Sequence, residues 1–183
     1  MKLINTKIEG LVVIEPKVYK DSRGFFFEPY NKSKFDKYFG ITNFVQDNES
    51  KSSKGVLRGF HFQKPPYDQA KLVRCIEGEV LDIALDLRKK SNTFGQFEKV
   101  ILSSENKKQF FIPRGFAHAF LVLSESAIFS YKVDNVYAPE YDDGIIWNDP
   151  NLSIDWGFDK SELIISKKDK KLISFSDFNS PFS

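Results

Sequence analysis

Cysteine is almost absent from this sequence of 183 residues, which contains a single one, Cys75. One cysteine cannot form an intramolecular disulfide, so the class of small secreted proteins held together by disulfides is excluded. We therefore expect a reducing compartment, the cytoplasm. A chain of this length buries about 70% of the surface that its unfolded form exposes, enough for a hydrophobic core without such crosslinks. We expect one domain over residues 1–183.

The sequence also lacks an excess of charge of one sign and a long apolar run. Its 27 Lys and Arg residues against 25 Asp and Glu residues give a net charge of +2, and the basic residues are scattered along the chain. We therefore expect no binding to nucleic acid and no polybasic attachment to a membrane. No segment approaches the roughly 20 apolar residues of a transmembrane helix, and residues 1–10 have no apolar stretch typical of a signal peptide.

Aromatic residues, in contrast, are abundant and make up 15% of the chain, which favours strands over a helical bundle. Over residues 79–87, apolar Leu81, Ile83 and Leu85 alternate with Asp82 and Ala84, which predicts a half-buried strand. The same alternation occurs at 11–15, 24–30, 44–49, 56–63, 71–76, 97–102, 109–112, 116–123 and 127–133. About ten short strands separated by turn residues predict an all-β protein, an antiparallel sandwich or barrel.

Helix signals are sparse. The spacing of aromatic residues predicts one short helix over residues 33–39, ending before Gly40. A second helix is expected to begin at Ser166, because Ser166 and Asp169 have the spacing of a capping box. The tail over residues 173–183 is rich in Ser, Phe and Asn, and we expect it to fray or to dock on a partner subunit.

The only two histidines, His61 and His118, both lie in predicted strands. Regular alternation places Leu57 on the face of His61, and Phe116 and Phe120 on the face of His118, so both imidazoles are expected inside the barrel. An imidazole there can act as a general base or bind a metal ion. A hydrogen-bonded core histidine explains the pattern about as well.

Residues 112–120 read IPRGFAHAF, a Pro-x-Gly-x-x-His pattern that resembles the second signature of the cupin barrels. The first signature of metal-binding cupins supplies two histidines as His-x-His, whereas this sequence has His61, Phe62 and Gln63 at that place. Two imidazoles without a carboxylate make a poor site for a transition metal. The resemblance therefore implies a cupin-type double-stranded β-helix, a jelly-roll barrel with a few short helices, that holds no metal.

A closer resemblance covers nearly the whole chain, from about residue 8 to residue 172. The run QDNESKSSKGVLRGFHFQKPPYDQAKLVRCIEGEV at 46–80 is preceded by RGFFFEPY and followed by FSYKVDNVYAP, IIWNDPNLSIDW and ISKKDKKL. These motifs are similar to those of the dTDP-4-dehydrorhamnose 3,5-epimerase family, in the same order and at the same spacing.

The resemblance implies an isomerase that needs no cofactor and converts dTDP-4-dehydro-6-deoxy-D-glucose to dTDP-4-dehydro-L-rhamnose. The C4 ketone of such a substrate acidifies the protons at C3 and C5, and inversion needs a base on one face and a proton donor on the other. Two other enzymes stay open: one that inverts a single centre, and one that uses another nucleotide-linked 4-keto sugar. The alternative outside catalysis is a cupin that only binds sugar nucleotides.

The resemblance also implies roles for individual residues. His61 matches the base, Asp169 the carboxylate that pairs with it, Tyr131 the proton donor and Lys71 the cation beside the ketone. Positions that hold the sugar nucleotide are matched by Arg23, Phe26, Glu28, Gln46, Asn48, Arg58, His118, Asp142 and Lys167, with Asp142 in place of the usual Glu. The family further implies a homodimer with exchanged N-terminal strands, in which Arg23 and Glu28 reach the partner's site.

Ordinary structural explanations exist for several of these residues. Asp169 can cap a helix at Ser166, Tyr131 can be a core tyrosine, and Lys71 can protect a sheet edge. Arg58 and His61 also present a conflict, because a regular strand places them on opposite faces although the family uses both in one site. A bulge at Gly59, or phosphates that approach over the strand end, would resolve it.

Overall fold

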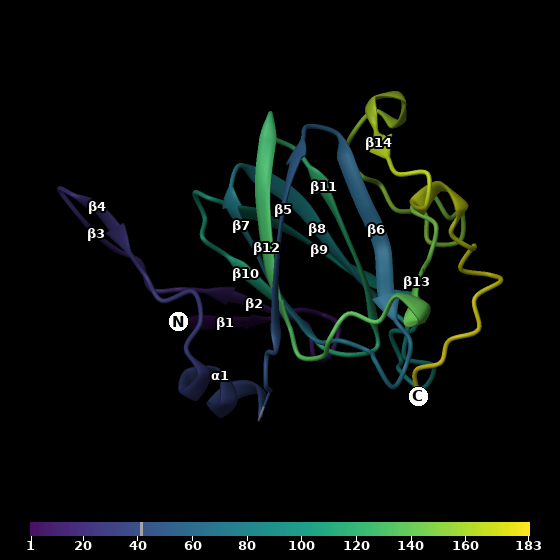
Figure 1. Ribbon diagram of the computed structural model, residues 1–183, viewed down its shortest axis with the longest axis horizontal. Helices are drawn as coiled ribbons and strands as arrows, with labels where there is room; N and C mark the ends of the chain where they lie inside the picture. The colour runs from purple at the N-terminus through teal and green to yellow at the C-terminus, as the bar shows by residue number, and fades with distance from the viewer. Residues whose placement is uncertain (41) are drawn as a thin grey trace.

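Two β-sheets dominate the computed structural model, which describes residues 1–40 and 42–183 (Figure 1). The first sheet has the strand order β1 (Lys2–Asn5), β2 (Val12–Glu15), β10 (Gln109–Ile112), β7 (Lys71–Glu77), β12 (Ser126–Val133) and β5 (Gln46–Ser53). The second has the order β13 (Asp142–Gly144), β6 (Val56–Gln63), β11 (Phe116–Val122), β8 (Glu79–Asp86) and β9 (Phe97–Ser103). These pairings are antiparallel, and the short β14 (Ile164–Ile165) pairs with β6 in parallel.

The remaining elements lie at the edges of the sheets. β3 (Tyr19–Asp21) and β4 (Gly24–Phe26) form a hairpin that projects from the body of the molecule (Figure 1). The helices are α1 (Lys32–Phe39) and the 3₁₀ turns η1 (Pro139–Tyr141), η2 (Lys160–Glu162) and η3 (Asp169–Lys171). Within the described residues, no helix has both the length and the apolar character needed to cross a membrane.

The predicted all-β architecture is confirmed, with differences at the ends of the chain. Each of the ten predicted strand segments overlaps an observed strand, but 24–30 is extended only as far as Phe26, β5 runs on to Ser53, and β1, β3, β13 and β14 were not expected. The predicted helix is α1. The Asn31 side chain caps it by accepting the backbone N–H of Lys34, Phe35 is buried, and Gly40 ends it with a φ of +74°.

The main core lies between the two sheets. Val73, Phe110 and Phe129 of the first sheet meet Val80 and Phe120 of the second there. Burial of such side chains contributes about 1.5–3 kcal/mol each, so this layer holds the two sheets together.

A second apolar layer covers the outer face of the second sheet. Leu57, Ile83 and Leu121 pack there against Trp156 and Phe182 of the C-terminal segment. This layer corrects the prediction of a half-buried strand at 79–87: β8 is buried on both faces because its outer face is covered by this segment. Asp82 lies on the opposite, inner face of β8 with Val80 and Ala84, and it is 0% exposed.

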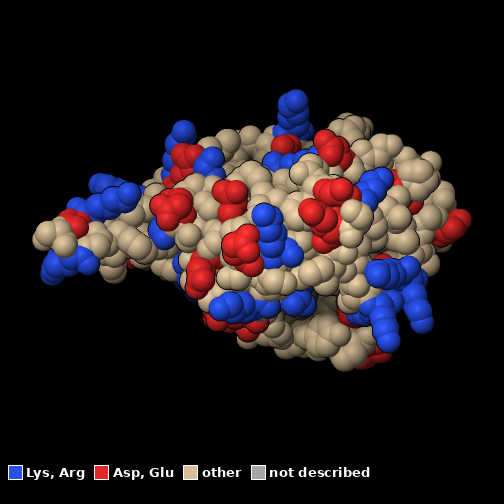
Figure 2. Space-filling view, turned by 90° about the horizontal axis from the view of Figure 1, so that it is seen from above, with Lys and Arg blue, Asp and Glu red and all other residues tan. Residues whose placement is uncertain are grey.

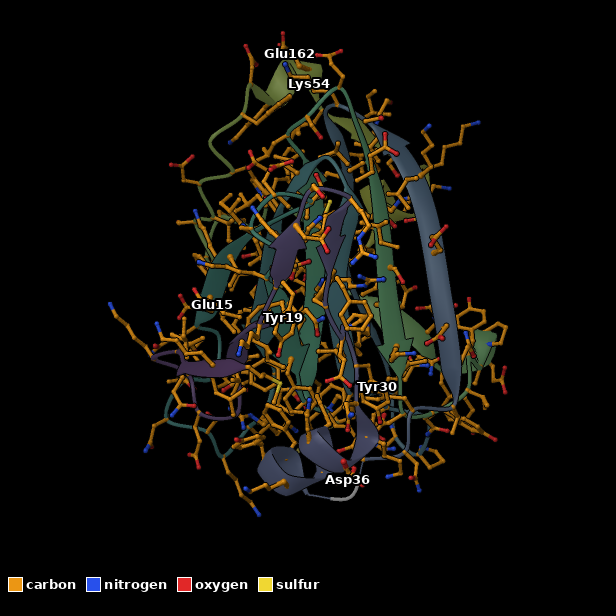
Figure 3. All side chains as sticks on the ribbon, turned by 90° about the vertical axis from the view of Figure 1, so that its left-hand side faces the viewer. Glu15, Tyr19, Tyr30, Asp36, Lys54 and Glu162 are labelled. Carbon is orange, nitrogen blue, oxygen red and sulfur yellow. The ribbon has the colours of Figure 1, made fainter. Side chains whose placement is uncertain are left out.

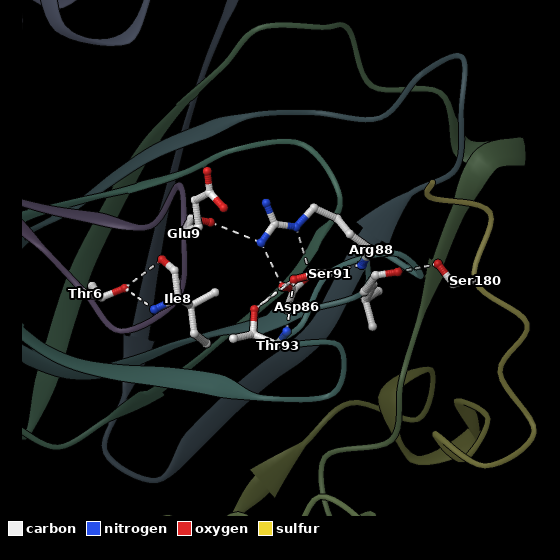
Figure 4. A network of polar contacts seen from close by, with 9 residues as sticks. Thr6, Ile8, Glu9, Asp86, Arg88, Ser91, Thr93 and Ser180 are labelled. Carbon is white, nitrogen blue, oxygen red and sulfur yellow. Dashed lines mark hydrogen bonds and ion pairs between the residues drawn. The ribbon is translucent and has the colours of Figure 1, made fainter.

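The C-terminal tail, which was expected to fray or to dock on a partner subunit, packs on its own chain. Phe178 and Phe182 pack edge-on against Phe62 of β6, and the Ser180 hydroxyl donates to the carbonyl oxygen of Leu87. Beside it lies a partly buried network of polar contacts (Figure 4). Its centre is the Asp86 carboxylate, which accepts hydrogen bonds from the side chains of Arg88, Ser91 and Thr93.

A bulge at Gly59 resolves the conflict between Arg58 and His61. His118 of β11 lies opposite His61, but Phe120 lies opposite Arg58, so the register between the two strands shifts by one residue. Arg58 and His61 therefore both face the space between the sheets. Leu57 packs on the outer face instead, so its predicted place beside His61 is wrong.

Glycine is required at the bulge for two reasons. Gly59 has a φ of +122°, and a Cβ there would lie 2.6 Å from the Ala119 Cβ and from the His118 carbonyl oxygen. Gly157 also has a positive φ, +62°, but nothing lies within 4 Å of its Cβ position. A comparison of alanine substitutions at Gly59 and Gly157 therefore separates two free-energy costs: that of the backbone conformation, and that of a clash between β6 and β11.

We predict that Gly59→Ala lowers the free energy of unfolding by about 3 kcal/mol or more, because it adds a steric clash to the strained backbone. The matched control Gly157→Ala is expected to cost only about 1 kcal/mol, the price of the left-handed conformation. Urea denaturation of the two variants measures the difference. Equal losses would mean that the approach of β6 to β11 does not demand glycine.

Candidate active site

A cavity of about 390 Å³ opens between the two sheets. The predicted site residues that line it are Gln46, Asn48, Arg58, His61, Lys71, His118, Tyr131 and Asp142. They come from six different strands, so the packing of the sheets, not closeness in sequence, brings them together.

His61 forms a pair with Asp169, although the two residues are 108 positions apart. His61 Nε2 lies 2.8 Å from Asp169 Oδ1, and the Gly59 backbone N–H donates to Asp169 Oδ2 at 3.4 Å. Burial disfavours ionisation of this carboxyl, but the hydrogen bonds from His61 and Gly59 outweigh it and hold the pKa of Asp169 below its ordinary value. An ionised Asp169 accepts the Nε2 proton, so Nδ1 of His61 carries the lone pair that a base needs.

The alternative explanation of Asp169, a helix cap at Ser166, involves the backbone N–H of Asp169. The Asp169 backbone N–H donates to Ser166 Oγ at 3.0 Å and opens η3. The Asp169 carboxylate meanwhile contacts His61 and the Gly59 backbone N–H. The turn therefore places the carboxylate against His61, and the expected helix is only one 3₁₀ turn long.

Tyr131 and Lys71 face His61 from the other sheet. Tyr131 lies on β12, packs against the apolar core beside Phe129 and lines the cavity. Burial raises the pKa of the Tyr131 hydroxyl, so the group stays protonated at neutral pH. Lys71 is 9% exposed, and burial lowers its pKa to about 8, although Asp142 and Asp82 oppose the shift. At pH 7 Lys71 is therefore a cation enclosed in the protein.

His118 belongs to a second histidine–carboxylate pair. Its Nε2 lies 2.8 Å from Oδ2 of Asp82, a carboxylate that burial shifts to a raised pKa. Asp82 was missed because the alternation of 79–87 assigned it to a solvent-facing side. The signal available in the sequence was its parity, which it shares with the inward-facing Val80 and Ala84 of the same strand.

Asp142 lies at the mouth of the cavity, where two further side chains contact it. The Lys168 ammonium group donates to Asp142 Oδ2, and the Tyr137 hydroxyl donates to the same oxygen at 3.2 Å. Both residues escaped the sequence-based prediction, and no pattern around them distinguishes them from surface residues. The predicted Lys167 is exposed and does not line the cavity.

Arg23, Phe26 and Glu28 do not reach the cavity of their own chain. They lie on and after the projecting hairpin, where Phe26 is 67% exposed. The Arg23 guanidinium pairs with Asp21 at 2.6 Å, and Glu28 pairs with Lys34 of α1. Figure 3 views the molecule from this side, with Tyr19 on the hairpin, Tyr30 just before α1 and Asp36 in α1.

A model of the dTDP-4-dehydrorhamnose 3,5-epimerases matches residues 5–177. The chain belongs to this epimerase family. A dTDP-4-dehydrorhamnose 3,5-epimerase of Escherichia coli is 51% identical over 178 residues, which cover 97% of this chain and 96% of the relative.

Solved structures of epimerases from two bacteria have the same fold. That of the dTDP-4-dehydrorhamnose 3,5-epimerase from Elizabethkingia anophelis matches with a TM-score of 0.94 and 52% identity, over 98% of both chains. That of an epimerase from Legionella pneumophila, in complex with dTDP-4-keto-L-rhamnose, matches with a TM-score of 0.95 and 46% identity, over 100% of this chain and 98% of that one. The cupin-type barrel expected from the sequence is thereby confirmed.

The arrangement of possible metal ligands bears on whether this member of the epimerase family can hold a metal ion. Among residues 1–40 and 42–183, no three or more His, Cys, Asp or Glu side chains are arranged to hold a metal ion. His61 and His118 each contact a carboxylate, but the two carboxylates lie in different elements, η3 and β8.

The buried Lys71 of this epimerase makes its stability depend on pH. The folded state releases the Lys71 proton near pH 8 and the unfolded state near 10.5, so the unfolded state binds more protons between these values. The free energy of unfolding therefore rises with pH through this range. We predict that the wild type gains about 3 kcal/mol relative to Lys71→Met as the pH rises from 8 to 10.5.

Urea denaturation of both proteins over this pH range measures the gain. Other groups that titrate in the same range contribute equally to both proteins and cancel. Parallel pH profiles for the two would show that Lys71 is not perturbed by burial.

Proposed function

We propose that this chain is a dTDP-4-dehydrorhamnose 3,5-epimerase that converts dTDP-4-dehydro-6-deoxy-D-glucose to dTDP-4-dehydro-L-rhamnose. One observation carries the proposal. His61 on one sheet, held by the Asp169 carboxylate of η3, and Tyr131 on the facing sheet line the same cavity. Inversion of a carbon centre requires such an arrangement, with a proton acceptor on one face of the sugar and a proton donor on the other.

The proposed reaction proceeds through an enolate. His61 Nδ1 takes the proton from the carbon next to the C4 ketone, and Asp169 stabilises the imidazolium that forms. Electrons of the broken C–H bond move to the ketone oxygen, where the Lys71 cation stabilises the negative charge. Tyr131 then donates its proton to the opposite face of the carbon. Solvent restores the proton of Tyr131 and removes that of His61, and the sequence repeats at the second carbon.

Arg58 is the proposed contact for the diphosphate. Its guanidinium lines the cavity and is oriented by Ser52 Oγ, at 3.2 Å from Nε and 3.1 Å from Nη2. A guanidinium fixed in this way offers its remaining donors to phosphate oxygens. Gln46 and Asn48 of β5 are joined by a hydrogen bond of 2.8 Å and face the same space, where they supply neutral donors and acceptors.

Solvent deuterium tests the function and the roles of the two faces together. In D₂O, the wild type is expected to place deuterium at both C3 and C5 of dTDP-4-dehydro-6-deoxy-D-glucose with inversion at each, which NMR detects. Deuterium at one centre only would identify a single-centre epimerase, and none at either would identify a protein that only binds sugar nucleotides.

Tyr131→Phe is expected to separate exchange from inversion in the same assay. The enolate still forms, but without the hydroxyl it regains deuterium from the His61 side. Exchange should therefore exceed epimerisation by about 10-fold or more. His61→Asn is the control and should lose both activities. If Tyr131→Phe inverts as fast as it exchanges, another group is the donor.

We further propose that the protein acts as a homodimer in the cytoplasm. Arg23, Phe26 and Glu28 match positions that bind the sugar nucleotide, yet they lie on or just after the projecting hairpin and do not line the cavity of their own chain. Exchange of hairpins between two subunits would bring them to the partner's cavity. The only thiol of the chain, Cys75, is buried and unpaired, which agrees with a reducing compartment.

A mixture of two defective variants tests the exchange. His61→Asn lacks the base, and Arg23→Ala lacks the contact that its hairpin would supply to the other subunit. A mixed dimer then has one site with both residues intact, so co-refolding should restore about a quarter of the wild-type activity. The unmixed variants, refolded alone, are the controls. A mixture no more active than their average would show that Arg23 does not serve the other subunit.

A further inference from the structure

Gln63 has no task in the mechanism above, although it occupies a conspicuous position. It stands where metal-binding cupins have their second histidine, two residues after His61 on β6, and it is 4% exposed. A buried carboxamide is costly unless its N–H groups and its oxygen find partners. The partners of Gln63 explain what it does.

All three hydrogen bonds of the Gln63 side chain go to backbone groups of two loops. Nε2 donates to the carbonyl oxygen of Tyr67 at 2.6 Å and to that of Val136 at 3.1 Å. Oε1 accepts the backbone N–H of Ala138 at 2.7 Å. Both donors and the acceptor are therefore used, and one side chain ties β6 to both loops.

Tyr137 lies between the two residues that Gln63 holds in the second loop. The Tyr137 backbone N–H donates to Gln46 Oε1 at 3.2 Å, and its hydroxyl donates to Asp142 Oδ2. Asp142 is itself the cross-strand neighbour of Gln63, on β13. The ring of Tyr137 lines the mouth of the cavity and is 54% exposed, so its place depends on these contacts and not on burial.

The loop that carries Tyr137 has no regular structure of its own. β12 ends at Val133, and the next turn, η1, begins at Pro139. Backbone groups in such a segment need partners outside a ladder. Gln63 and Gln46 supply them for three consecutive residues, and Gln69 Nε2 adds a bond to the Asn135 carbonyl oxygen at 2.8 Å.

We propose that Gln63 is a positioning residue for substrate binding. Its carboxamide fixes Tyr137 at the cavity mouth relative to His61, which lies on the same strand as Gln63. The inference rests on the proposed function, because it gives Tyr137 a share in binding the nucleotide part of the substrate. Without Gln63, three backbone groups lose their partners and the loop moves away from the arrangement that receives the ligand. Binding then suffers while the reacting groups stay in place.

Gln63→Met tests this, because it keeps the size of the side chain and removes all three hydrogen bonds. We expect KM for the 4-keto sugar nucleotide and the Kd of dTDP, measured by calorimetry, to rise by about 10-fold, with kcat within about 3-fold of the wild type. Asn106→Leu is the control. Asn106 also makes three hydrogen bonds to backbone groups, in the turn between β9 and β10, so its loss should lower Tm without changing KM.

A double-mutant cycle shows whether Gln63 acts through Tyr137. Tyr137→Ala should weaken dTDP binding, and adding Gln63→Met should then change the Kd by less than about 2-fold. If Gln63→Met does not fold, Gln63→Glu takes its place in the cycle, since it keeps the shape and an acceptor for Ala138 but loses at least one of the two donors. A wild-type Kd in the single variant, equal losses in kcat and kcat/KM, or independent effects in the cycle would each overturn the inference. A wild type that neither binds dTDP nor epimerises would instead contradict the proposed function.

Discussion

The close approach of β6 to β11 at Gly59 determines which side chains the cavity receives. The one-residue shift in register turns Arg58 and His61 toward the same space, and Phe60 and Phe62 toward the outer apolar layer. Gly59 also donates its backbone N–H to Asp169, the carboxylate that holds His61. A single residue without a side chain therefore sets the direction of the proposed base, of the proposed diphosphate contact and of the carboxylate behind the base.

Around the cavity, each of the two histidines contacts a carboxylate. Asp169 contacts His61, and Asp82 contacts His118. Among residues 1–40 and 42–183, no carboxylate forms a hydrogen bond or ion pair with Lys71; Asp142 and Asp82 act on it through their charge, and burial still lowers its pKa to about 8. A lysine that is costly to keep charged is well suited to stabilise an enolate, because new negative charge beside it removes part of that cost.

Much of the fold followed from the sequence because alternation reports which side chains are buried. It located the longer strands of the two sheets but missed the short β1 and β13. It failed to predict burial where burial was two-sided, as in β8, and where a bulge broke the parity, as at Leu57. The predicted site residues that line the cavity were identified through the family resemblance, since His61, Lys71 and Tyr131 lie in strands that meet only after folding. Asp82, Tyr137 and Lys168 were missed because their importance depends on contacts with distant segments.

At position 63 of the barrel this chain has glutamine where metal-binding cupins have a histidine, and the consequence extends beyond the loss of a metal ligand. A histidine at position 63 would offer a ring with one donor and one acceptor, whereas the glutamine uses two donors and one acceptor on loop backbone. The organisation of the mouth is therefore linked to the residue that replaces the ligand.

The charge distribution also bears on how a dianionic ligand arrives. The net charge of the chain is only +2, and Figure 2 shows Lys and Arg interspersed with Asp and Glu over one face of the molecule. Charges of opposite sign at such spacing cancel beyond a Debye length, about 8 Å at physiological ionic strength. On this face a diphosphate therefore meets little net attraction at a distance, whereas Arg58 and the buried Lys71 attract it within the cavity. Diffusion to the protein is close to that for a neutral target, and electrostatic attraction acts on retention more than on encounter.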